Sequence, residues 1–126
     1  MVRFNSMLDG YRINIMNIND FKTLSENILQ ECYATIGDKE EYTKDEGVQI
    51  IVSMPDIICS HLGISIETLS LLKGPIQSKM ERYIPKFIRG PAKIEGTIMA
   101  YLCSVMEVTG KAQDGFGFKV LKKSNL

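Results

Sequence analysis

The chain has 126 residues, of which 44% are hydrophobic and 24% are charged, and this composition excludes a disordered segment and fits a single folded domain. Fifteen basic and fifteen acidic residues cancel, so the overall charge favours no class of partner. Three widely spaced cysteines exclude a disulfide framework, and the N-terminus lacks signal-peptide features. The longest apolar run, Ile98–Met106, is about half as long as a membrane span. We therefore expect a cytoplasmic protein that does not cross a membrane.

A strand and a helix are predicted first along the chain. Residues Gly10–Ile18 alternate apolar and polar side chains, which indicates a half-buried strand. Asn19 or Asp20 then caps a helix that Gly37 ends. The apolar residues of this helix share one face: Phe21, Leu24, Ile28, Cys32 and Ile36.

Residues 47–54 fit either a helix or a strand. Thr43 and Glu46 have the spacing of a capping box, which would begin a helix here. The segment is also rich in β-branched residues, which favour a strand: Val48, Ile50, Ile51 and Val52. The helix is favoured by the motif that follows, which needs a supporting helix upstream, but both alternatives stay open.

The segment Pro55–Gly74, PDIICSHLGISIETLSLLKG, has the layout of two short helices crossing at a steep angle. Cys59 is a small residue where the helices touch, Gly63 tolerates positive φ at the turn, and Ser65 opens the second helix. The remaining apolar positions point to a shared core: Ile58, Leu62, Ile64, Leu69 and Leu72. Over these twenty or so residues the chain resembles the helix-turn-helix group of DNA-binding proteins. The resemblance implies a second helix that enters the DNA major groove.

The exposed positions of this second helix depart from that group. These positions are Ser65, Ile66, Glu67, Ser70 and Leu71. None of them is Arg, Lys, Asn or Gln, the side chains that make bidentate contacts with bases. Ser65 and Ser70 can reach phosphates or bases, and Ile66 can meet a thymine methyl group. The competing interpretation is a pair of core helices joined by a glycine turn, without a role in DNA binding.

Residues 73–93 are the only strongly basic segment, with six basic residues against Glu81 alone. Lys79, Arg82 and Lys86 fall on one face of a helix that Gly74-Pro75 introduces, although Pro85 interrupts the pattern. Such a stripe is either a phosphate-binding strip or the solvated face of an amphipathic helix. The predicted DNA-binding residues are therefore Ser65, Ile66, Ser70, Lys73, Lys79, Arg82, Lys86 and Arg89.

A long helix is predicted over 93–109. Its apolar stripe consists of Ile94, Ile98, Tyr101, Val105 and Val108. This stripe suits either a core helix or a dimer interface, and the resemblance to dimeric regulators implies a homodimer that uses it. Asp114-Gly115 then predicts a turn into a terminal strand, in which Phe116, Phe118 and Val120 alternate with Gly117 and Lys119. We expect this strand to pair with the N-terminal one.

Little in the sequence indicates an enzyme. His61, the single histidine, lies two residues from Cys59, and this spacing points the two side chains about 200° apart on a helix. No metal-ligand spacing occurs, and the lone G-x-G at Gly115–Gly117 is explained by a turn. We therefore expect no catalytic residue, no metal and no cofactor.

The sequence thus predicts a single α+β domain, mostly helical, with a central helix-turn-helix-like unit over 47–74 and short strands near the two termini. The function it favours is a small DNA-binding, transcription-regulator-like protein that contacts phosphates of duplex DNA through the basic segment. The alternative is a protein-interaction or ligand-sensing domain with no nucleic-acid role, which the apolar Ile66 and Leu71 favour.

Overall fold

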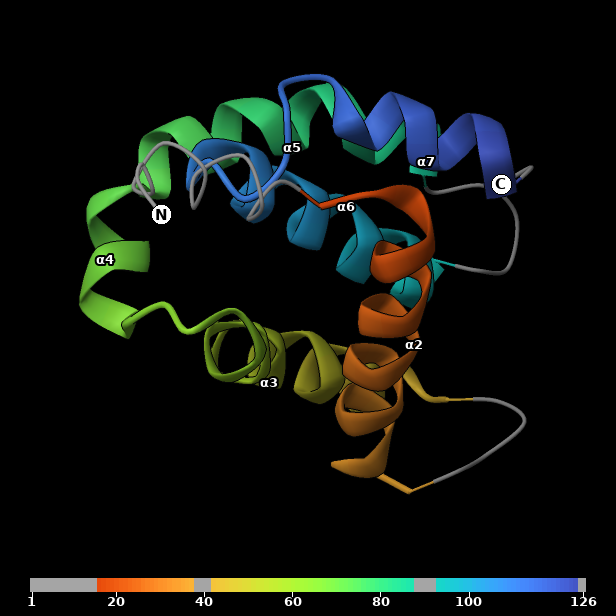
Figure 1. Ribbon diagram of the computed structural model, residues 1–126. Helices are drawn as coiled ribbons and strands as arrows, with labels where there is room; N and C mark the ends of the chain where they lie inside the picture. The colour runs from red at the N-terminus through yellow and green to blue at the C-terminus, as the bar shows by residue number, and fades with distance from the viewer. Residues whose placement is uncertain (1–15, 38–41, 88–92, 125–126) are drawn as a thin grey trace.

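The computed structural model describes residues 16–37, 42–87 and 93–124, and this part of the chain folds into helices without a strand (Figure 1). The helices are α2 (Ile18–Ala34), α3 (Lys44–Leu62), α4 (Ile66–Leu71), α5 (Lys73–Phe87), α6 (Lys93–Val108) and α7 (Phe116–Ser124). The fold is all-α, so the predicted α+β class is wrong.

Helix α6 is the centre of the fold and packs against α2, α3, α5 and α7. Between Ile98 and Glu107 only Tyr101 keeps appreciable exposure. A helix that is apolar on every side is stable only when other helices surround it, and this sequence carries apolar or small side chains on all sides. None of the described helices is long and apolar enough to cross a lipid bilayer.

Side-chain caps begin the first two helices. Asn17 accepts a hydrogen bond from the Asp20 N–H and begins α2. The Thr43 hydroxyl accepts from the Glu46 N–H at 3.2 Å, and the Glu46 carboxylate accepts from the Thr43 N–H at 2.9 Å, so the predicted capping box is confirmed. Residues 47–54 are therefore helical, and Ile50 among them is fully buried in the core.

Helices α3, α4 and α5 follow one another with short turns. Gly63 ends α3 with φ +67° and ψ +34°, and the Ile64 N–H donates to the Cys59 carbonyl at 3.0 Å. Ser65 then caps α4 through the Thr68 N–H. Pro85 lies inside α5 without ending it, because the helix continues to Phe87.

The terminal strand predicted over Phe116–Val120 is wrong, because these residues begin α7. Phe116 and Val120 are both buried, and their spacing of four residues puts them on one face of a helix. The alternation that suggested a strand came from Phe118, which is exposed, and from Gly117, which is buried against the Tyr83 ring. Glycine is required there, because a Cβ atom at position 117 would lie 2.5 Å from Tyr83 Cζ.

The N-terminal strand predicted over Gly10–Ile18 lies mostly outside the described residues. Its last residue, Ile18, begins α2. The Met16 N–H donates to the Lys111 carbonyl at 2.9 Å, which ties the approach to α2 to the α6–α7 connection.

Candidate functional site

In the structure, the helix-turn-helix-like unit presents an apolar surface. Its supporting helix and its first motif helix are one continuous helix, α3, and its second helix, α4, has six residues. The side chains of Ile66 and Leu71 on α4 are 43% and 84% exposed. Ser65 is engaged as the N-cap, which leaves Ile66 and Ser70 as the predicted contact residues on this helix.

Lys79, the first residue of the predicted basic stripe, is committed to acidic partners inside the protein. Its Nζ lies 3.2 Å from Glu107 Oε1, and it also forms an ion pair with Asp114. The hydrogen bond to Asp114 and, secondarily, the interaction with Glu107 raise the pKa of Lys79. With its charge neutralised in this way, Lys79 is a poor phosphate ligand.

Glu107 joins three elements through one buried carboxylate. Its Oε2 accepts from the Tyr83 hydroxyl of α5 at 2.6 Å and from the Gly117 N–H of α7 at 2.9 Å. Its Oε1 accepts from the Gly115 N–H at 3.0 Å. Burial and the hydrogen bond to Glu107 raise the pKa of Tyr83, so its hydroxyl stays protonated and donates. The carboxylate fixes α7 beside α5, at the helix terminus where a negative charge is favourable.

This arrangement brings basic residues from two helices together. The Arg82 guanidinium of α5 lies over the Phe118 ring of α7, 5.8 Å from its centroid. Lys79 pairs with Asp114 just before α7, and one turn later Tyr83 shares the Glu107 carboxylate with Gly117 of α7. Because both contacts advance along the two helices together, α5 and α7 run in the same direction. One turn further along each helix, Lys86 and Lys122 therefore continue the same surface. We call this surface the basic face: Arg82, Lys86, Lys119 and Lys122, all exposed.

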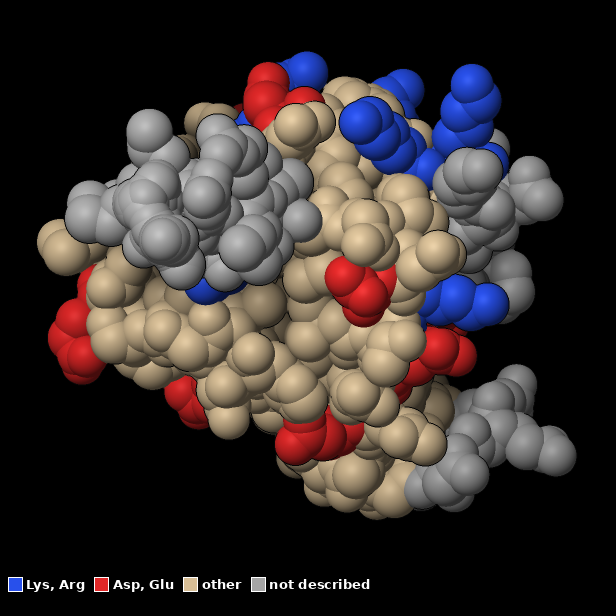
Figure 2. All heavy atoms as spheres, viewed as in Figure 1, with Lys and Arg blue, Asp and Glu red and all other residues tan. Residues whose placement is uncertain are grey.

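The molecule separates its charges although they sum to zero. Helices α2, α3 and α4 contain seven acidic and two basic residues, whereas α5 and α7 contain seven basic residues and one acidic residue. In Figure 2, several lysine and arginine side chains gather at the upper right, over α7 and the adjoining end of α5, whereas acidic side chains are spread over the lower part, the left edge and the top of the view. No acidic residue of the described part forms an ion pair with a member of the basic face.

The predicted site residues divide between two places. Lys73 begins α5 beside α4, with Ser65, Ile66 and Ser70, whereas Arg82 and Lys86 lie on the α7 side. Arg89 lies outside the described residues. Lys119 and Lys122 were not among the predicted residues, because the segment that forms α7 was predicted to be a strand. A helix could have been predicted from the four-residue spacing of Phe116 and Val120, which places both lysines away from the buried face of α7.

The apolar stripe predicted as a dimer interface packs inside the chain itself. Ile98 and Val105 are fully buried, and Ile94, Tyr101 and Val108 are half-buried. The Ile94 side chain, for example, packs against Gly47 of α3. A second copy of the chain cannot contact Ile98 or Val105 without opening the core.

The cysteines and the histidine form no reactive site in the described part. All three cysteines are buried as free thiols, and burial raises the pKa of Cys32 to about 11. His61 is paired with Glu31 instead of with a thiol. Among the described residues, no cluster of His, Cys, Asp and Glu has the composition of a metal site.

Comparison with known proteins adds no relative: no family model matches the chain, and no curated protein or solved structure is significantly similar to it.

Proposed function

We propose that the protein binds duplex DNA through the phosphate backbone and that the basic face is its contact surface. The observation that carries the proposal is the contact between Arg82 of α5 and the Phe118 ring of α7, on neighbouring helices that also carry the exposed Lys86, Lys119 and Lys122. Duplex DNA is the partner that the helix-turn-helix resemblance implies. The proposed contact surface is the α5–α7 pair, whereas the resemblance implies contact through the second motif helix.

The charges favour contacts with phosphates over contacts with bases. Lysine and arginine neutralise phosphates without reading sequence, and each contact releases counterions. Helix α4 presents apolar side chains and Glu67 instead of the side chains that read base edges. The acidic residues of α2 and α3 repel the backbone, so the separated charges turn the basic face toward the polyanion.

A titration of a short fluorescent duplex with the full-length protein at low salt tests the proposal. Four phosphate contacts predict that log K falls with log salt with a slope of about −3 to −4. The charge-reversal pair Lys86→Glu with Lys122→Glu should weaken binding more than about tenfold and reduce this slope by about 2 to 4, since each reversal removes a contact and adds repulsion.

A matched control changes the same number of charges elsewhere. Lys22→Glu with Lys44→Glu alters two exposed lysines on α2 and α3 and should affect binding far less than the first pair. Equal losses for the two pairs would show that only net charge matters, and the basic face would then not be a site. No binding by the unmodified protein at tens of micromolar would end the proposal.

A second candidate function, a protein-interaction domain, is supported by the exposed apolar side chains of α4, Leu71 at 84% and Ile66 at 43%. Large apolar side chains exposed on a surface can mark contacts with a partner or a second copy. Leu71→Asp should then abolish self-association measured by light scattering while the circular dichroism spectrum stays unchanged. An unmodified protein that is monomeric at all concentrations would exclude self-association through this surface.

A further inference from the structure

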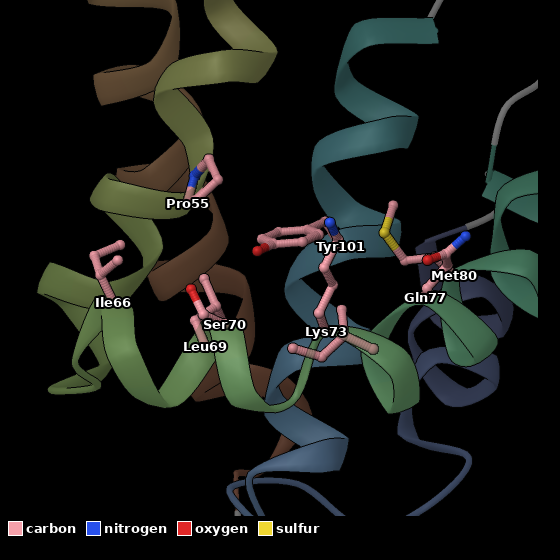
Figure 3. A pocket seen from close by; sticks show the side chains of 9 residues that line it. Pro55, Ile66, Leu69, Ser70, Lys73, Gln77, Met80 and Tyr101 are labelled. Atoms are coloured by element: carbon pink, nitrogen blue, oxygen red, sulfur yellow. The ribbon is translucent and has the colours of Figure 1, made fainter.

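A pocket of about 380 Å³ lies where α3, α4, α5 and α6 meet, on a different part of the molecule from the basic face (Figure 3). Its wall is mainly apolar: Pro55 from α3, Ile66 and Leu69 from α4, and Ile76 and Met80 from α5. A volume above 300 Å³ and an apolar lining with a few polar groups are typical of small-molecule sites.

The polar groups of the pocket are free to bind. The Tyr101 side chain extends from α6 into the pocket with its hydroxyl toward Pro55 and Ser70, and Lys73 reaches from the start of α5 toward the Tyr101 side chain (Figure 3). Within the described part, neither Tyr101 nor Lys73 makes a side-chain hydrogen bond or an ion pair. The same holds for the other two polar side chains in the lining, Ser70 and Gln77.

The charge of the pocket indicates the charge of the ligand that it favours. Among the described residues that line the pocket, Lys73 alone is charged, so an anionic group is favoured next to it. Burial and, secondarily, Cys59 raise the pKa of Tyr101 to about 12, so its hydroxyl is a hydrogen-bond donor at neutral pH. An ammonium and a phenol in one mainly apolar pocket are complementary to a carboxylate attached to an apolar body.

The volume sets the size of the ligand. About 380 Å³ lies at the lower end of the range for small-molecule sites, so the ligand is small. We infer that this pocket binds a small amphipathic monocarboxylate, with its carboxylate at Lys73 and Tyr101 and its apolar body against Leu69, Ile76 and Met80. The inference does not depend on nucleic-acid binding.

Nuclear magnetic resonance titration of the ¹⁵N-labelled full-length protein with decanoate tests the inference. We expect saturable shifts of amide signals around the pocket at sub-millimolar to millimolar decanoate, and weaker binding of decanol, which lacks the charge. Lys73→Gln keeps most of the side chain but removes the charge, and should weaken decanoate binding about tenfold while leaving decanol unaffected. Tyr101→Phe should weaken decanoate binding about tenfold through loss of one hydrogen bond to the carboxylate.

Lys86→Gln is the matched control, because it removes a charge from the same helix on the basic face and should leave decanoate binding unchanged. It should lower DNA affinity, so failure of the pocket and failure of the basic face give different results. The inference is overturned if decanoate and decanol bind equally, if Lys73→Gln has no selective effect, or if the shifted signals lie outside the pocket. Shifts of the pocket signals that depend on protein concentration alone would assign the pocket to a second copy instead.

Discussion

The α3–α4 turn and the α5–α7 pair each join two helices through a glycine, but the glycine has a different physical role in each. Gly63 provides a left-handed backbone conformation, and no heavy atom of the described part lies within 4 Å of the position its Cβ atom would take. Gly117 provides space, since the Tyr83 ring occupies that position. The first junction is determined by neighbouring residues, whereas the second depends on a carboxylate contributed by α6. Local patterns therefore reveal the first junction and conceal the second.

The largest effect is expected from Glu107→Ala, which removes the carboxylate that joins α5 to α7. The Tyr83 hydroxyl, the Gly115 and Gly117 N–H groups and the Lys79 ammonium would all lose an acceptor. Removal of one partner from a buried charged network costs about 3–5 kcal/mol, so urea denaturation should show a loss of that size in the free energy of unfolding.

Glu26→Ala provides the control for this variant, because Glu26 is an exposed glutamate on α2 and its removal should change the free energy of unfolding by less than about 0.5 kcal/mol. If the two substitutions cost the same, Glu107 would not hold α7 in place, and the basic face would lose its structural basis.

The next largest effect is expected from Gly117→Ala. The added methyl group would meet a ring that is fixed by a hydrogen bond to Glu107 and by ring contacts with Phe87 and Phe118. Overpacking of a rigid core typically costs about 1–3 kcal/mol, and we expect about 2 kcal/mol by urea denaturation. A neutral effect would show that α7 shifts easily along α5.

Gly63→Ala should have a smaller effect, about 1 kcal/mol, because alanine must adopt the left-handed conformation but meets no neighbouring atom. Gly63→Asn separates the two roles, since asparagine tolerates this conformation and should restore most of the lost stability. At position 117 asparagine should be worse than alanine, because the space is already filled. If glycine, alanine and asparagine had the same order of melting temperatures at positions 63 and 117, the two junctions would not differ in the way described.

The same distinction explains how much of this molecule the sequence predicts. The Thr43–Glu46 capping box, the Gly63 turn and the apolar face of α2 depend on residues within a few positions of one another, and the structure contains all three. Helix α7 was not predicted because Phe116, Phe118 and Val120 together fit a strand pattern, whereas only Phe116 and Val120 fit a helix pattern over so few residues. The choice is made by tertiary contacts with Tyr83 and Glu107.

The candidate site follows the same rule. Arg82 and Lys86 were predicted on one helical face, but their neighbours Lys119 and Lys122 arrive through packing of α7. Lys79 has the correct spacing for the stripe, yet its charge is neutralised by Glu107 and by Asp114, which lies 35 positions later in the chain. Periodicity along a helix gives the direction of a side chain and says nothing of which partner is already there.

The smallest effect concerns Asp114, the exposed partner of Lys79. The hydrogen bond and the charge of Lys79 lower the pKa of Asp114 in the folded state. A carboxylate whose pKa is lower in the folded than in the unfolded state stabilises the fold above its unfolded pKa of roughly 3.9, and this contribution disappears as pH falls through the folded value. Asp114→Asn should therefore have a slightly lower melting temperature than the unmodified protein at neutral pH, and the two should converge as the pH falls through the folded-state pKa of Asp114.

Asp56→Asn is the matched control, because Asp56 is an exposed carboxylate on α3 that forms no ion pair in the described part of the chain. It should show a smaller difference from the unmodified protein at neutral pH and correspondingly less convergence in acid. Parallel melting curves for Asp114→Asn and the unmodified protein across this range would mean that Asp114 does not hold Lys79. In that case Glu107 alone would hold Lys79, its ammonium would be more available to phosphates, and the basic face would extend one turn toward the start of α5.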